Sequence, residues 1–218
     1  MARPEREDPA AIADALARGL RELVEPDLPV DAVGFSFGGV MSAWLAARHP
    51  DLVRRLIVIG SGGLGTPVGD IQLTRVRGLQ GESRREALRT NLLGLMLHHP
   101  ESVDALALQL QDANIANGRL DPKGLVQPDR LSDALSRVSA QLDAIWGACD
   151  RAHPVEGGQE AVLRRFEPDL DFRVVPEAGH WAMYERADTF NRTLIALLEQ
   201  PLRSPGQASP REELLQSG

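Results

Sequence analysis

The sequence predicts an α/β fold built on a parallel sheet, and three observations carry that prediction. Short apolar runs at residues 30–34, 56–59, 141–146 and 172–175 have the composition of strands. Helical patterns lie between these runs, and strands that alternate with helices form parallel sheets with right-handed crossovers. One long segment, residues 66–140, has helical patterns and no convincing strand, which indicates a helical insertion into the sheet.

The elements before the insertion begin with a helix over residues 9–25, because Asp8 followed by Pro9 is a typical helix start. Its apolar face at helical spacing consists of Ile12, Leu16, Leu20 and Leu23. The first strand, 30–34, leads into a helix over residues 38–48. The next run, Leu56-Ile57-Val58-Ile59, does not alternate with polar residues, which favours a strand buried on both faces.

The insertion itself contains three predicted helices, over residues 81–100, 100–118 and 127–138. The second presents Val103, Leu106, Leu110 and Ala113 on one face. After it, the two remaining strands are followed by helices over 159–166 and 187–199. We therefore divide the chain into an N-terminal core part (1–65), a helical cap (66–140), a C-terminal core part (141–200) and a polar, mobile tail (201–218).

Composition excludes several classes of protein. The chain has 218 residues, 43% of them hydrophobic, and a net charge of −7. That charge argues against nucleic acid as a partner. No apolar run is long enough to span a membrane, and the first residues lack the apolar core of a secretory signal. The single cysteine, Cys149, excludes an internal disulfide and a multi-cysteine metal site. We expect a cytoplasmic protein.

A possible nucleophile lies in the sequence Gly34-Phe35-Ser36-Phe37-Gly38, which has the pattern G-x-S-x-G. This pattern directly follows a predicted strand and opens a predicted helix, which is the setting of a nucleophile elbow. Small residues permit the tight turn, and the free N–H groups of the helix N-terminus favour a developing oxyanion. The sequence therefore predicts Ser36 as a nucleophile.

A serine nucleophile needs a base, and the base needs an orienting acid. His180 follows the last predicted strand, and Asp150 follows the strand before it. Loops at the carboxyl ends of parallel strands hold the sites of α/β proteins, and the chain order serine, aspartate, histidine is that of the elbow hydrolases. The other histidines are expected on the surface, with His153 in a solvated loop.

At this point the sequence resembles a known family. The segments VGFSFGG, RLIVIGSGGLG, AIWGACDRAHP and EAGHWAMYERADTFNRTLIALLE are similar to the α/β-hydrolase superfamily, nearest to the carbon–carbon bond hydrolases of meta-cleavage products. The resemblance implies a catalytic triad of Ser36, Asp150 and His180, an oxyanion hole that uses the Phe37 N–H, a helical cap, and no metal or cofactor. It also suggests a small-molecule substrate and a homo-oligomer. Phe35 and Trp181 are candidates for substrate contact, or for packing alone.

Two departures from that family bear on function. The cap helix offers no arginine to hold a substrate carboxylate, and Arg119 lies just after it. The substrate is therefore expected to be uncharged or differently held. The nucleophile elbow also lies only about thirty residues from the start of the sequence. We therefore expect the chain to start within the domain, without the N-terminal strands of that family and without the loop that donates the second oxyanion N–H.

Two functions follow as alternatives. One is a serine hydrolase that cleaves a small apolar ester, or a carbon–carbon bond next to a ketone. The other is a non-catalytic or weakly active remnant of such a hydrolase that serves as a binding subunit.

Overall fold

A four-stranded parallel sheet forms the centre of the protein. The computed structural model describes residues 8–25, 28–118, 126 and 128–203. The strands, in the order in which they neighbour one another, are β1 (Val30–Phe35), β2 (Val53–Ile59), β3 (Gln141–Gly147) and β4 (Asp171–Val175). The predicted parallel α/β sheet is therefore confirmed. Within the described residues, β1 pairs with β2 alone and lies at the edge of the sheet.

Strand β2 is buried on both faces of the sheet from Leu56 to Ile59. Leu56 and Val58 of β2 belong to a large apolar cluster with residues of the helices α1 (Pro9–Arg21), α2 (Phe37–Arg48), α6 (Arg130–Leu135) and α7 (Gln159–Phe166). Ile57 and Ile59 point the other way, into a cluster with helix α9 (Ala187–Glu199). Successive side chains of a strand alternate between faces, so a continuous β-branched run serves both layers. The prediction for residues 56–59 is confirmed.

The helix start at Asp8 is confirmed, and the predicted apolar face of that helix is correct in part: Ile12 and Leu20 pack against the large core cluster, whereas Leu16 and Leu23 are exposed. The Asp8 carboxylate accepts a hydrogen bond from the Ala10 N–H at 3.0 Å, and Pro9 occupies the first turn. The buried residues are Ala13 and Ala17, whereas Leu16 is 45% exposed. Leu23, 84% exposed, lies beyond the end of the helix. Small side chains let α1 lie close against α2, and that close approach decides the buried face.

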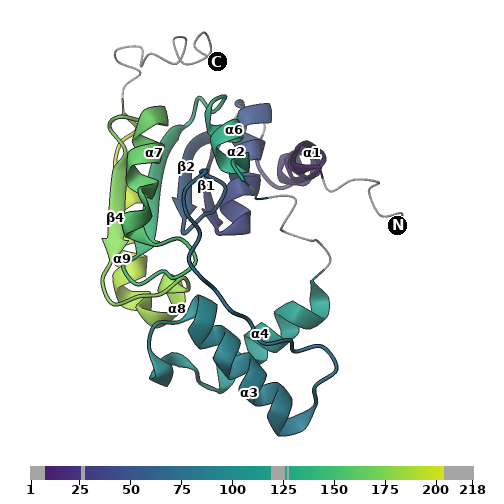
Figure 1. Ribbon diagram of the computed structural model, residues 1–218. Helices are drawn as coiled ribbons and strands as arrows, with labels where there is room; N and C mark the ends of the chain where they lie inside the picture. The colour runs from purple at the N-terminus through teal and green to yellow at the C-terminus, as the bar shows by residue number, and fades with distance from the viewer. Residues whose placement is uncertain (1–7, 26–27, 119–125, 127, 204–218) are drawn as a thin grey trace.

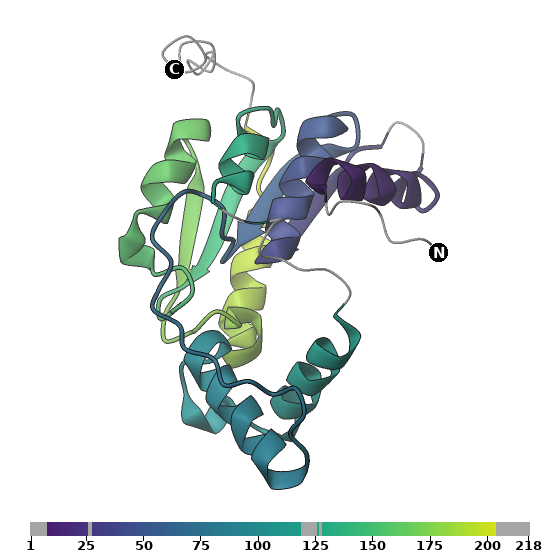
Figure 2. The same ribbon diagram turned by 45° about the vertical axis from the view of Figure 1, so that its right-hand side comes forward.

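The first helix of the segment predicted as a cap is shorter than expected. Helix α3 (Gly81–Asn91) passes into a π-helical turn, η1 (Leu92–Met96), and a separate 3₁₀ turn, η2 (Pro100–Ser102), follows. The single helix predicted over 81–100 is therefore wrong, because the chain leaves the helix at Leu97. In both views the α3–α4 pair lies together below the sheet (Figures 1 and 2).

Helix α4 (Ala105–Asn117) begins after Asp104, whose carboxylate accepts the Ala107 N–H. It buries Ala107 and Leu108, whereas Leu106 and Leu110 of the predicted face are 53% and 40% exposed. The predicted helix over 127–138 corresponds to α6, which packs against α2 in the large core cluster rather than beside α4. Arg119 lies outside the described residues.

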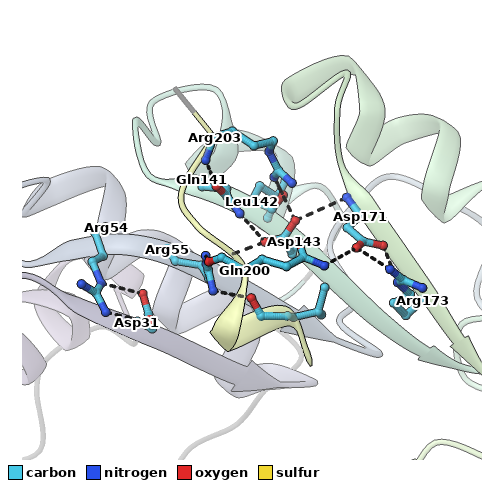
Figure 3. A network of polar contacts seen from close by, with 11 residues as sticks. Asp31, Arg54, Arg55, Gln141, Leu142, Asp143, Asp171, Arg173, Gln200 and Arg203 are labelled. Atoms are coloured by element: carbon cyan, nitrogen blue, oxygen red, sulfur yellow. Dashed lines mark hydrogen bonds and ion pairs between the residues drawn. The ribbon is translucent and has the colours of Figure 1, made fainter. Parts of the chain in front are cut away.

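A buried polar network closes the end of the sheet where the strands begin. Figure 3 shows Asp143 of β3 at its centre, where it accepts hydrogen bonds from Gln141 and Arg203 at 2.8 and 2.9 Å. The buried Arg55 guanidinium donates to the carbonyls of Leu197 and Gln200 at the end of α9. Arg203, two residues beyond the predicted start of the mobile tail at 201, thus hydrogen-bonds to Gln141, Leu142 and Asp143 of β3. The rest of that tail lies outside the described residues.

Short elements complete the chain. The 3₁₀ turn η3 (Val155–Gly157) precedes α7, and helix α8 (Ala182–Glu185) separates β4 from α9. The predicted bounds of α7 and α9 agree with the structure. In the part of the chain that the structure describes, no helix is long and apolar enough to cross a membrane.

Candidate active site

Ser36 lies at the junction between β1 and α2. Its backbone has φ 49° and ψ −119°, a conformation that a residue with a side chain rarely adopts. The Ser36 N–H donates to the Ile59 carbonyl at 2.8 Å, so the serine is held against the end of β2. Phe37 is the first residue of α2, and the first N–H groups of a helix have no acceptor within it. The turn therefore presents a hydroxyl beside unsatisfied donors.

His180 and Asp150 lie within hydrogen-bond distance of each other and of Ser36. His180 Nδ1 is 2.8 Å from Asp150 Oδ2, and His180 Nε2 is 3.0 Å from Ser36 Oγ. A carboxylate only accepts hydrogen bonds, so this contact assigns the ring proton to Nδ1 and leaves Nε2 to accept from the serine hydroxyl. Asp150 is 3% exposed and His180 is 4% exposed. The structure thus brings together the three residues that the sequence predicts.

The second oxygen of Asp150 also has donors. Asp150 Oδ1 accepts the N–H groups of Ala152 and His153 at 2.9 and 3.0 Å. A carboxylate with partners on both oxygens keeps one orientation, and charge-assisted bonds of this kind are stronger than neutral ones. The loop after β3 therefore fixes the acid, and the acid fixes the histidine ring.

Two glycines allow the acid and histidine loops to approach each other. A Cβ on Gly60, which has φ +51°, would lie 3.1 Å from Asp150 Oδ2 and 3.3 Å from His180 Nδ1. A Cβ on Gly147 would lie 2.2 Å from the Gly179 carbonyl oxygen. Sequence reasoning did not single out these residues. In the sequence each is a glycine at or just after the end of a buried strand. This pattern alone does not predict which loop lies against the glycine.

The two aromatic candidates, Phe35 and Trp181, pack with the same apolar cluster, and Phe35 also lies against the His180 ring. The Phe35 ring centroid is 4.8 Å from that of His180, so Phe35 lies directly against the imidazole. Trp181 is 9% exposed and packs in the apolar cluster of the α3–α4 region with Leu88, Leu92 and Leu97. Phe37 packs against the large core cluster below the elbow.

His153 was predicted to be solvated, and that prediction is wrong. Its ring centroid is 5.8 Å from that of His180, and a Cβ on Gly62 would meet its Cε1 at 2.7 Å. Burial lowers the pKa of His153, with a smaller opposing effect from Asp150. The sequence signal was its position three residues after Asp150 on the same short loop. Among the described residues, no cluster of histidine, cysteine, aspartate and glutamate could hold a metal ion.

Comparison with known sequences identifies relatives of this chain. The model of the alpha/beta hydrolase family matches residues 2–193. The 2-hydroxy-6-oxo-6-phenylhexa-2,4-dienoate hydrolase of Burkholderia cepacia is 31% identical over 180 residues, covering 76% of this chain and 61% of that protein. The 2-hydroxymuconate semialdehyde hydrolase of Pseudomonas putida is 31% identical over 184 residues, covering 78% and 62%. The chain therefore spans about three fifths of the length of these curated relatives.

Solved structures share the fold. The meta-cleavage product hydrolase of Pseudomonas fluorescens IP01 has a TM-score of 0.64 and 23% identity, covering 90% of this chain and 74% of that one. A thermophilic esterase from Thermogutta terrifontis has a TM-score of 0.63 and 20% identity, covering 91% and 74%. The strand order, the serine at the strand–helix junction and the family match over most of the chain agree: this chain belongs to the alpha/beta hydrolase family.

Proposed function

We propose that this chain carries the catalytic centre of a serine hydrolase, with Ser36 as nucleophile, His180 as base and Asp150 as orienting acid. The observation that supports this most directly is the continuous series of hydrogen bonds from Ser36 Oγ through His180 to Asp150 Oδ2, at 3.0 and 2.8 Å. The strained backbone of Ser36 is a second support, because strain of this kind concentrates at functional sites.

These contacts support a two-step reaction. His180 Nε2 accepts the hydroxyl proton as Ser36 Oγ attacks the substrate carbonyl carbon, and the Phe37 N–H stabilises the oxyanion. The protonated His180 then donates its proton to the leaving group. In the second step His180 takes a proton from water, the hydroxide releases the acyl group from Ser36 as a carboxylic acid, and the proton returns to the serine.

For the substrate, we propose either a small apolar ester or a ketone next to a cleavable carbon–carbon bond. The relative from Burkholderia cepacia is a 2-hydroxy-6-oxo-6-phenylhexa-2,4-dienoate hydrolase, which supports the second class. Phe35, beside His180, would contact the substrate near the reacting carbon, and Trp181 would contribute the part of its ring that stays exposed. The cytoplasmic location and the homo-oligomer remain predictions.

The test combines labelling with a paired substrate assay. Wild-type protein is expected to react with a fluorophosphonate probe at Ser36 and to hydrolyse either a 4-nitrophenyl ester or 2-hydroxy-6-oxo-6-phenylhexa-2,4-dienoate. Replacing a triad serine or histidine typically lowers turnover by about 10⁶-fold. Full hydrolysis by Ser36→Ala would overturn the assignment, and the ratio of the two activities decides between ester and carbon–carbon cleavage.

The alternative, a non-catalytic binding subunit, rests on the fact that the chain spans about three fifths of its relatives' length. It predicts a cooperatively folded protein that does not react with the fluorophosphonate probe. Stoichiometric labelling at Ser36 would exclude it.

A further inference from the structure

Glu185 joins two segments that are far apart in the sequence. Its Oε1 accepts hydrogen bonds from the N–H groups of His98 and His99, both at 2.8 Å, and its Oε2 accepts the Gly179 N–H at 2.6 Å. Three charge-assisted bonds to one carboxylate form a strong and directional contact. Glu185 lies at the end of the short helix α8, five residues after His180.

One of these segments is the point where the cap leaves its first helix. The π-helical turn η1 ends at Met96, and Leu97 is extended, with φ −119° and ψ 141°. The N–H groups of the next two residues need acceptors outside the helix, because buried backbone donors are rarely left unpaired. The Glu185 carboxylate supplies that acceptor for both.

The other segment is the loop that carries His180. Gly179 immediately precedes the histidine and donates to Glu185, and Trp181 immediately follows it and donates from its N–H to the Met96 carbonyl at 2.8 Å. The backbone is thus held on both sides of His180, by contacts at the end of the same π-helical turn.

Gly179 permits this close approach. A Cβ at that position would lie 2.9 Å from the His98 nitrogen, 2.9 Å from the Met96 carbonyl oxygen and 3.0 Å from Glu185 Oε2. The absence of a side chain therefore places the histidine loop directly on the exit of the π-helical turn, where a carboxylate reaches both.

We propose that Glu185 is a positioning residue, which sets the His180 loop against the base of the cap and so keeps the His180 ring in line with Ser36. This inference rests on the proposed serine hydrolase function. It assigns Glu185 an effect on turnover, because the carboxylate acts through the backbone beside the base: its hydrogen bonds go to the N–H groups of His98, His99 and Gly179 and not to Ser36 or Asp150.

The test is Glu185→Gln, with Glu177→Gln as the matched control. A glutamine has the same shape, but its amide nitrogen cannot accept a hydrogen bond, so either the Gly179 bond or the His98 and His99 bonds are lost. Glu177 lies three residues before His180, and its side chain is 73% exposed. Among the described residues its carboxylate pairs only with Arg186, while its backbone carbonyl, which the substitution leaves in place, lies 3.0 Å from His99 Nε2. Its substitution makes the same change in charge without touching these bonds.

The expected result for Glu185→Gln is a kcat about 10- to 100-fold lower with KM within about twofold, since a misplacement near 1 Å costs on the order of 10²-fold. The fluorophosphonate reaction slows by a similar factor, and Glu177→Gln stays within about twofold of wild type. Amide hydrogen exchange in peptides that cover 96–101 and 176–181 becomes faster in Glu185→Gln alone.

Several outcomes would overturn the proposal. One is an unchanged kcat in Glu185→Gln, with or without a rise in KM. Another is a decrease of kcat in Glu177→Gln as large as that in Glu185→Gln. A third is a Glu185→Gln protein that is unfolded under the assay conditions, which would make Glu185 a determinant of folding. A wild-type chain without hydrolysis contradicts the proposed function instead. In that case the exchange measurement still tests whether Glu185 holds the two segments together.

Discussion

Replacing Gly34 by alanine tests whether the elbow depends on the contact between β1 and α2. A Cβ on Gly34 would lie 2.5 Å from Gly39 Cα, 2.6 Å from the Gly38 carbonyl oxygen and 2.7 Å from the Gly39 nitrogen. All three are backbone atoms, so no side chain can rotate away. Ordinary contact begins at 3.4 Å, which means that the start of α2 must move by roughly 1 Å.

Such a movement affects both stability and chemistry. Overpacking a well-packed site costs about 1–3 kcal/mol. With a urea m-value of about 2 kcal/mol/M, a loss of about 2 kcal/mol lowers the unfolding midpoint by about 1 M. Because Ser36 and Phe37 move with the helix start, a displacement near 1 Å also predicts turnover reduced by on the order of 10²-fold.

Gly38→Ala is the matched control. Gly38 is the other glycine of the G-x-S-x-G pattern, and a Cβ there meets nothing within 4 Å. Alanine is better than glycine within a helix by roughly 0.5–1 kcal/mol, so the midpoint stays equal or rises. Urea unfolding and hydrolysis rates of the two variants are compared side by side. If Gly34→Ala matches Gly38→Ala in both measurements, the steric reasoning is refuted.

Three further predictions concern stability. Asp143→Ala leaves the buried Arg55 without its carboxylate and is expected to destabilise the fold by about 3–5 kcal/mol in urea unfolding, while activity per folded molecule stays unchanged because the network lies at the opposite end of the sheet from Ser36. His153 has a lowered pKa, so below pH about 6.5 the unfolded chain binds a proton that the folded chain does not. The free energy of unfolding therefore decreases as the pH is lowered, by at most about 1.4 kcal/mol per pH unit from this group. We expect His153→Leu to make the free energy of unfolding less dependent on pH between pH 7 and 5.5. Asp8→Ala removes the helix cap and is expected to lower the free energy of unfolding by about 0.5–2 kcal/mol; an unchanged midpoint would exclude a capping role.

Local patterns in the sequence predict the elements well because they depend on neighbouring residues. The strand at 56–59 and the helices α7 and α9 are recognisable from apolar spacing and end signals alone. The side chains Ser36, Asp150 and His180 are predictable for a related reason. Each follows its own parallel strand, and the carboxyl ends of such strands lie at one edge of the sheet.

The buried faces of α1 and α4 were only partly predictable in this way. In α1 and α4 the leucine-rich face looked apolar, yet Ala13, Ala17 and Ala107 are fully buried while Leu16 and Leu106 are about half exposed. Spacing identifies a face, but the distance between two helices decides which side chains fit between them, and that distance is a property of the whole packing.

The sequence by itself therefore determined the fold class, the order of the elements and the identity of the three candidate catalytic residues. Only the tertiary structure showed that a side chain has space at Gly38 but not at Gly34. It also showed that His153 lies beside His180, and that Glu185 accepts hydrogen bonds from His98 and His99. These features arise where segments distant in the sequence meet, up to 87 residues apart for Glu185 and His98. They result from steric and electrostatic contacts between these distant segments, and the pattern of neighbouring residues in the sequence does not predict such contacts.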